Sequence, residues 1–183
     1  IYTLSLHDAL PISTSAGKRD FLAVHVQKAH MSSKVGIVRR ALTVFEDYGV
    51  SVEHIPTGVD SFGIVVNGAD VQDSIYSIVH DLQKELKPDS INVVDRLALI
   101  SVVGRNMSRR AGTSGRVFGV LGEAGINIRM ITQSSQEISI ILGVNNADFE
   151  RAITCIYDKF VAGEMVEIPQ QGEGQPTGAR RAT

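Results

Sequence analysis

The sequence has few of the features that stabilise or anchor proteins outside the cytoplasm. Its single cysteine, Cys155, can form neither an internal disulfide nor a cysteine-based zinc site. No apolar run approaches the roughly 18 residues that a membrane-spanning helix needs. These two absences predict a cytoplasmic protein that does not enter a membrane.

An excess of basic charge is missing too. The 183 residues include 18 Lys and Arg against 20 Asp and Glu, which gives a formal net charge of -2 at pH 7. A nucleic acid or an anionic membrane requires a basic face, and an RNA-binding βαββαβ domain also requires aromatic side chains on its central strands. Only Phe21 and Phe62 are aromatic within the predicted strands. The composition therefore argues against nucleic acid and membrane as partners.

Catalytic and metal-binding motifs are absent as well. The sequence contains no GxxxxGK(S/T) phosphate loop, no HExxH and no GxSxG. The histidines beyond the first 13 residues stand at no ligand spacing and are interpreted as surface or hydrogen-bonded side chains: His25, His30, His54 and His80. No catalytic residue, metal site or bound cofactor is predicted in this chain.

Both ends of the chain differ from its centre. Residues 1–13, IYTLSLHDALPIS, lack the basic segment and cleavage site of an export signal and resemble the translation of a sequencing adapter. The alternative is a short natural helix or strand. Residues 170–183 are polar and almost free of large apolar side chains, so we expect a disordered tail there.

The central part contains an internal repeat. A shift of 76 positions brings glycines, a methionine and the apolar positions of the two halves into register. The matches include Met31 with Met107, Gly36 with Gly112, Gly49 with Gly125, and residues 64–66 with 140–142. This register predicts two copies of one structural unit.

Within each unit, the hydrophobic pattern predicts the order βαββαβ. Apolar residues alternate over 22–26 in the first unit, and a counterpart strand is expected at 97–103 in the second. Helical spacing follows at residues 38–45 and 117–124. The predicted fold class is α+β: two ferredoxin-like βαββαβ domains, residues 20–96 and 97–168, with antiparallel sheets covered by helices on one face. The second domain has only a weak candidate for its last strand, near residues 165–168.

The first unit carries a candidate site for a free α-amino acid. Residues 31–36 lead into the start of a helix, where unpaired N–H groups and the helix dipole favour a carboxylate. Glu53, in the following strand, could hold an ammonium group; the alternative is an ordinary solvent-facing residue. The second unit has Arg129 at the position of Glu53 and Gln133 at that of Thr57. Only the first unit is therefore expected to bind.

Two stretches carry a family resemblance. GVSVEHIPTGVDSFGIVV and LGEAGINIRMITQSSQEISIILGV are similar to the paired ACT domains at the C-terminal end of aspartate kinases, and the resemblance extends over residues 20–160. It implies a regulatory region that binds an end-product amino acid, lysine and/or threonine, between neighbouring subunits of a homodimer. The parent enzyme transfers phosphate from ATP to L-aspartate, giving 4-phospho-L-aspartate. By this resemblance ATP and Mg²⁺ belong to a kinase domain absent from this chain, which is expected to be a non-catalytic fragment.

The resemblance also implies a set of effector-binding residues in the loop, the helix start and the strand: Met31, Gly36, Ile37, Val38, Ser51, Val52, Glu53 and Thr57. The helix-start backbone would take the carboxylate of the effector, and Glu53 an amino group. The sequence departs from the family at Glu53, where many members have Asp, and at Gly58-Val59, where many have Ser-Glu. The alternative function is a free-standing tandem ACT protein that senses an amino acid for another enzyme.

The resemblance makes one further prediction about the second sheet. In aspartate kinases, a strand that precedes the first ACT domain completes the sheet of the second. Because the adapter-like residues occupy that place here, we expect the second sheet to be open or irregular at one edge.

Overall fold

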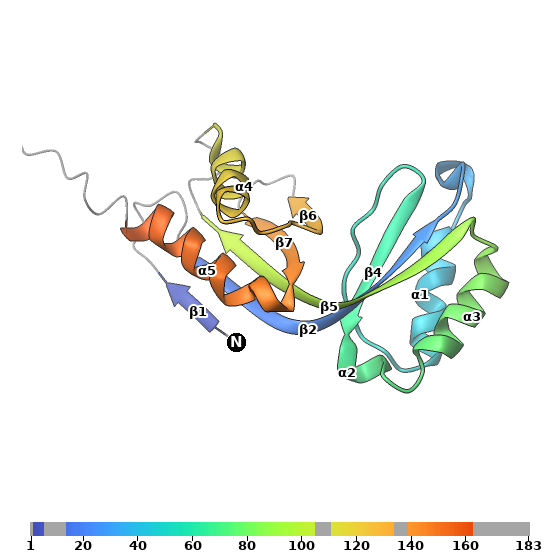
Figure 1. Ribbon diagram of the computed structural model, residues 1–183. Helices are drawn as coiled ribbons and strands as arrows, with labels where there is room; N and C mark the ends of the chain where they lie inside the picture. The colour runs from blue at the N-terminus through green and yellow to red at the C-terminus, as the bar shows by residue number, and fades with distance from the viewer. Residues whose placement is uncertain (1, 6–13, 105–110, 134–138, 163–183) are drawn as a thin grey trace, which may run out of the picture.

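The described residues form one antiparallel sheet. The helices lie in two separate groups, which define two lobes (Figure 1). The structure is a computed structural model that describes residues 2–5, 14–104, 111–133 and 139–162. Its strands are β1 (Tyr2–Ser5), β2 (Thr14–Gln27), β3 (Val52–His54), β4 (Ser61–Asn67), β5 (Ser90–Val103), β6 (Met130–Gln133) and β7 (Ser139–Asn145). Their order in the sheet is β3-β4-β2-β5-β7-β6, and β1 pairs with β2 outside this path.

The helices are divided between the lobes. The first lobe carries α1 (Ile37–Asp47), α2 (Gly68–Val71) and α3 (Ile75–Leu86), and the second carries α4 (Thr113–Glu123) and α5 (Phe149–Tyr157) (Figure 1). Every strand pair is antiparallel. The predicted α+β class with ferredoxin-like units is therefore confirmed. No helix in the described part of the chain is long and apolar enough to cross a membrane.

Two long strands, β2 and β5, run through both lobes. Each has 14 residues, and they pair from Thr14 opposite Val103 at one end to Gln27 opposite Ser90 at the other. β4 pairs with residues 21–27 of β2, whereas β7 pairs with residues 97–103 of β5. Opposite halves of the same two strands therefore form the centres of the two lobes.

The expectation of an open second sheet is wrong. Residues 14–18 of β2 pair residue by residue with 103–99 of β5, so a strand that precedes the first unit does complete the sheet of the second. β1 adds a further strand outside it, pairing Tyr2 with Gly17 and Ser5 with Thr14. The expectation failed because the adapter-like segment ends before residue 14, and the completing strand begins there. The weak strand candidate at residues 165–168 lies outside the described residues.

The internal repeat is confirmed up to the third strand of each unit. α1 and α4 have 11 residues each at an offset of 76, and the glycines before and after them share positive φ angles: Gly36 (74°), Gly112 (81°), Gly49 (68°) and Gly125 (68°). Glycine fits these positions because a β-carbon is strained in this region. β4 and β7, however, correspond at an offset of 78. The match of residues 64–66 with 140–142 is therefore wrong by two, because the second unit has two more residues before its third strand, β7.

Each lobe has its own core, and a third cluster joins them. Alternating residues of the strands pack under α1 and α3 in one lobe and under α4 and α5 in the other. On the opposite side of the sheet, Phe21, Val65 and Leu97 are buried together, with Met130 of the second lobe packed against them. The two lobes are thus joined by side chains as well as by shared strands.

Candidate functional site

The β2–α1 loop, residues 28–36, is a tightly hydrogen-bonded turn. Met31–Ser33 forms a single 3-10 turn in which Ser33 donates to the carbonyl of His30 from both its N–H and its hydroxyl. The N–H of Lys34 then donates to the carbonyl of Met31 at 2.9 Å. The Met31 side chain is buried in the core of the first lobe. Hydrogen bonds therefore hold the loop in one conformation immediately before the N-terminus of α1.

The start of α1 offers free backbone donors. Gly36 precedes the helix with φ 74°, no side chain caps the helix, and its first backbone bond runs from the N–H of Arg40 to the carbonyl of Gly36. The N–H groups of Val38 and Arg39 consequently have no acceptor within the helix. Ile37 is buried and Val38 is partly buried, so the helix end is fixed by the core beneath it. This end can bind a carboxylate.

The predicted strand residues lie along the edge of the first lobe. Val52 is partly buried and pairs with Val66, whereas Ser51 and Thr57 are exposed. Glu53 is exposed, and β3 has an irregular register at this residue, between Val52 and His54. The carboxylate of Glu53 is therefore accessible to a ligand, as the binding hypothesis requires and as an ordinary surface residue would also be.

Seven of the eight predicted residues fall into two groups toward opposite ends of the first lobe, and Glu53 lies between the groups. Thr57 pairs with Phe62 near the start of β4, and Val52 pairs with Val66 near its end. At about 3.3 Å per residue these partners are about 13 Å apart. Met31, Gly36, Ile37, Val38 and Thr57 lie toward the end of the lobe where α1 begins, and Ser51 and Val52 lie toward the end where α1 stops. Glu53 lies between them.

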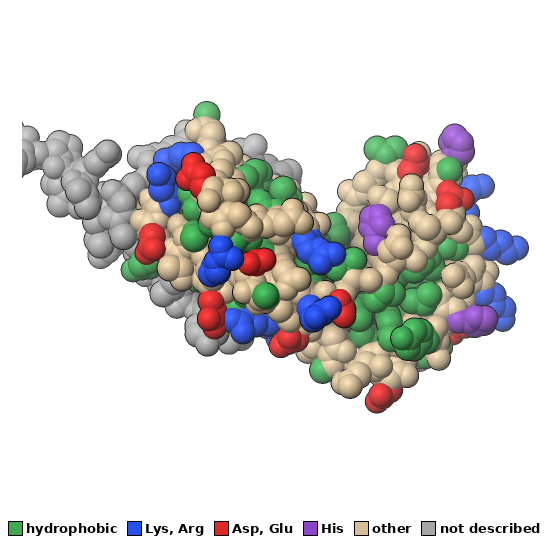
Figure 2. Space-filling model, in the orientation of Figure 1, with side chains coloured by type: hydrophobic (Ala, Val, Ile, Leu, Met, Phe, Trp, Pro, Cys, Tyr) green, Lys and Arg blue, Asp and Glu red, His purple; other side chains and the backbone are tan. Residues whose placement is uncertain are grey.

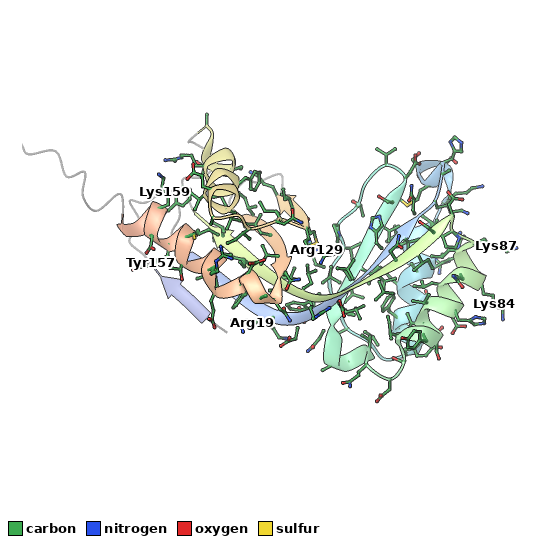
Figure 3. The ribbon with its side chains drawn as sticks, viewed as in Figure 1. Arg19, Lys84, Lys87, Arg129, Tyr157 and Lys159 are labelled. Carbon is green, nitrogen blue, oxygen red and sulfur yellow. The ribbon has the colours of Figure 1, made fainter. Side chains whose placement is uncertain are left out.

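The second unit has different side chains at the positions equivalent to the predicted site. Gln133 pairs with Ile140 as Thr57 pairs with Phe62. Its side-chain oxygen accepts a hydrogen bond from the hydroxyl of Ser114, at the start of α4, at 3.1 Å. Arg129 is exposed and lies between the two lobes in Figure 3. This unit thus has a cation where the first has Glu53, and its helix start already contacts its own strand.

Sequence reasoning missed two aspartates that contact the β2–α1 loop. Asp89, after α3, accepts the N–H of Ala29 at 2.6 Å through Oδ2, and Asp60, before β4, accepts the N–H of Met31 at 3.3 Å through Oδ1. Both stand in turns far from the loop in sequence. Their only local signal is that Asp is common in turns, which does not indicate a contact with a loop about 30 or 60 residues earlier.

Two titratable groups of the first lobe are perturbed. Burial lowers the pKa of His54, in β3, below its ordinary value, and its Nε2 has no hydrogen-bond partner among the described residues. A hydrogen bond to Asp81 raises the pKa of Tyr48, which follows α1. Within the described ranges no three His, Cys, Asp or Glu side chains are grouped to hold a metal ion. The face in Figure 2 shows acidic and basic side chains interspersed.

Comparison with known proteins identifies the fold family. The family model of the ACT domain matches residues 100–160. Aspartokinase 3 of Bacillus subtilis is 33% identical over 157 residues, which cover 85% of this chain and 35% of the relative. The crystal structure of Clostridium acetobutylicum aspartate kinase has a TM-score of 0.78 at 39% identity and covers 81% of this chain and 34% of that one. The chain is an ACT-domain regulatory region of the aspartate kinase family.

The same fold is also known as a separate chain. The regulatory subunit of aspartate kinase from Thermus flavus has a TM-score of 0.70 at 17% identity, and the match covers 82% of this chain and 99% of that subunit. In contrast, the chain spans about a third of the length of the Bacillus subtilis relative and 27% of the Saccharomyces cerevisiae aspartokinase. The ACT fold of the chain is therefore found both alone and within a longer protein.

Proposed function

We propose that this chain is the region through which an amino acid regulates an aspartate kinase. The effector is lysine and/or threonine, and it binds in the first lobe. The regulated enzyme transfers the γ-phosphoryl group of ATP to L-aspartate, giving 4-phospho-L-aspartate, and its ATP and Mg²⁺ are bound by a kinase domain outside this chain. The chain by itself is not catalytic, and it pairs with a second copy through its ACT domains.

One observation carries the proposal: both lobes have a helix start without a side-chain cap, but only the first lobe combines it with an accessible carboxylate on the following strand. The N–H groups at the start of α1 suit the carboxylate of an amino acid, and Glu53 suits an ammonium group. In the second lobe, Arg129 takes the place of the carboxylate. E. coli aspartokinase III, part of which has the same fold, has been solved in complex with lysine and aspartate, which makes lysine the first effector to test.

Regulation follows from differential binding. An effector can shift an enzyme between a more active and a less active arrangement only by its preference for one of the two. In this proposal the preferred arrangement is the less active one. Loss of the site should then leave the kinase active but resistant to feedback.

Calorimetric titration of the chain with L-lysine, L-threonine and L-methionine tests the proposal directly. We expect lysine or threonine to bind, and Glu53→Ala to weaken that binding by about tenfold or more, because a charge-assisted hydrogen bond is lost. Glu46→Ala is the matched control, since Glu46 is an exposed carboxylate on α1. Equal binding by Glu53→Ala and the unmodified chain would refute the assigned site.

The enzyme-level test uses a full-length aspartate kinase that contains this region. Glu53→Ala should leave catalysis intact and relieve inhibition by lysine or threonine. Unchanged inhibition in the variant would reject the role of Glu53, whatever the isolated chain binds.

A separate regulatory subunit or amino-acid sensor is the second candidate function. It is favoured by the near-complete coverage of the Thermus flavus regulatory subunit. The genomic DNA before the codon for Ser13 distinguishes the two candidates. A kinase-coding sequence in the same reading frame supports a single longer enzyme, and a start codon near residue 14 supports a separate protein.

A further inference from the structure

The conformation of the β2–α1 loop depends on acceptors that lie outside it. Asp89 accepts the N–H of Ala29 at 2.6 Å, and Asp60 accepts the N–H of Met31 at 3.3 Å. The carbonyl of Asp60 also accepts the N–H of Lys28 at 2.9 Å. Three consecutive or near-consecutive amides at the end of β2 are thus bound by two other loops of the first lobe.

These bonds enclose the one unfavourable residue of the loop. His30, between Ala29 and Met31, has φ 57°, in the left-handed region that residues with a β-carbon rarely adopt. The loop sequence does not favour this conformation by itself. Carboxylate acceptors on both sides of His30 compensate for it, because hydrogen bonds to charged groups are stronger than neutral ones.

Backbone hydrogen bonds link the residues held by Asp60 and Asp89 to the start of α1. The N–H of Lys34 donates to Met31, and the N–H of Ile37 donates to Lys34 at 3.4 Å, so a continuous series of backbone contacts connects Met31 with the helix start. A loop that relaxes around His30 would displace both Met31 and the donors of α1. The donors of α1 are the part of the proposed site that would bind the carboxylate of an effector.

We propose that Asp60 and Asp89 are positioning residues of the amino-acid site. They act through the β2–α1 loop: their carboxylates hold Ala29 and Met31 so that the start of α1 is presented in a binding geometry before any ligand arrives. This role rests on the proposed amino-acid regulation and adds to it two residues that lie outside the set carried by the family resemblance.

The test combines a structural and a binding measurement on the full chain. Amide hydrogen exchange reports whether Ala29 and Met31 are held, and calorimetric titration with L-lysine and L-threonine reports whether the site is formed. The variants are Asp89→Ala, Asp60→Ala and the two Asp→Asn replacements, which keep an acceptor oxygen. Asp73→Ala is the matched control, because Asp73 is an exposed aspartate between α2 and α3, beyond the far end of β4.

We expect Asp89→Ala to speed exchange at Ala29 and to raise the Kd by about tenfold, and Asp60→Ala to have a smaller effect in keeping with its longer bond. The Asn variants should restore most of the slow exchange and most of the affinity. A general loss of stability would not be reversed in this way. Asp73→Ala should change neither. If Asp89→Ala does not fold, Asp60→Ala and its Asn counterpart give the same comparison.

Two outcomes overturn the positioning role alone: unchanged exchange at Ala29 and Met31 in the Ala variants, or faster exchange with unchanged affinity. A third outcome is different in kind. If the unmodified chain protects Ala29 and Met31 but binds no amino acid, the proposed regulation fails together with the positioning role built on it.

Discussion

Asp20 and Asn146 exchange two hydrogen bonds at the boundary between the lobes. The backbone N–H of Asp20 donates to Oδ1 of Asn146 at 3.2 Å, and Nδ2 of Asn146 donates to Oδ1 of Asp20 at 2.7 Å. Asp20 has φ 69° and lies where the register of β2 against β5 shifts. Next to it, Arg19 pairs with Glu150 of α5 at 2.7 Å. The second lobe thus contacts β2 at the residue where this strand passes into the first lobe.

The Asp20–Asn146 contact is expected to contribute to stability as a pair. Asn146→Ala should lower the free energy of unfolding by about 1 kcal/mol, because the backbone amide and the side chain of Asp20 each lose a partner. Asp20→Gly removes the side chain while permitting the positive φ. A double-mutant cycle measured by urea unfolding should give a coupling of at least about 0.5 kcal/mol. Additive effects would show that the two residues do not cooperate.

Gly17 is required by a close approach of α5 to the sheet. A β-carbon at this position would lie 2.5 Å from Cε2 of Phe149 and 2.9 Å from the carbonyl oxygen of Leu99. Gly17→Ala should therefore destabilise the chain by about 1–3 kcal/mol, as overpacking does. The measurement is the midpoint of urea unfolding.

Gly119→Ala provides the opposite control. Gly119 is exposed within α4, and nothing lies within 4 Å of its added β-carbon. Replacement should stabilise the chain by up to about 1 kcal/mol, because alanine favours a helix more than glycine does. If Gly17→Ala proved as harmless as Gly119→Ala, the packing of Phe149 against β2 would be incorrect.

The sequence predicts the helices better than the strand offset between the two units and the backbone conformation between elements. Helical spacing and the four repeated glycines specify α1 and α4, since both are local signals that depend on neighbouring residues alone. The offset of 78 between β4 and β7, the third strands of the two units, was not recognised because an apolar run matches another apolar run equally well after a shift of two. The positive φ angles of Asp20 and Arg96 were also not predicted, because neither residue is glycine.

The candidate site shows the same division. Met31, Gly36 and Glu53 could be chosen from a loop, a helix start and a strand that follow one another in the chain. Asp60 and Asp89 could not, because a residue that supports a loop from 29 or 60 positions away leaves no periodic or motif signal. Contacts of this kind depend on the completed fold.

Leu97 is expected to stabilise both lobes at once. It is buried with Phe21 and Val65 on the side of the sheet opposite the helices, and Met130 of the second lobe packs against this cluster. Leu97→Ala should cost about 2–5 kcal/mol, and fluorescent or exchange probes in either lobe should report the same loss. Val59→Ala, at a side chain that is 76% exposed, is the control and should change stability by less than about 0.5 kcal/mol. A loss confined to the first lobe would contradict a shared core.

His54 is expected to make stability depend on pH. Burial lowers its folded-state pKa below the ordinary value of 6.5, so the unfolded chain binds the proton more readily than the folded one. The free energy of unfolding contributed by His54 is complete above about pH 6.5 and falls as the pH drops from there through the lower folded-state pKa. Its Nε2 has no partner among the described residues to offset protonation.

The measurement compares urea unfolding of the unmodified chain and His54→Gln at several values between about pH 8 and about pH 5. The difference in unfolding free energy between the two should shift in favour of His54→Gln as the pH falls, because glutamine binds no proton. A constant difference between the unmodified chain and His54→Gln across the whole range would mean that His54 titrates alike in the folded and unfolded states. Acid would then not lower the free energy of unfolding through His54, the neighbour of Glu53 in β3.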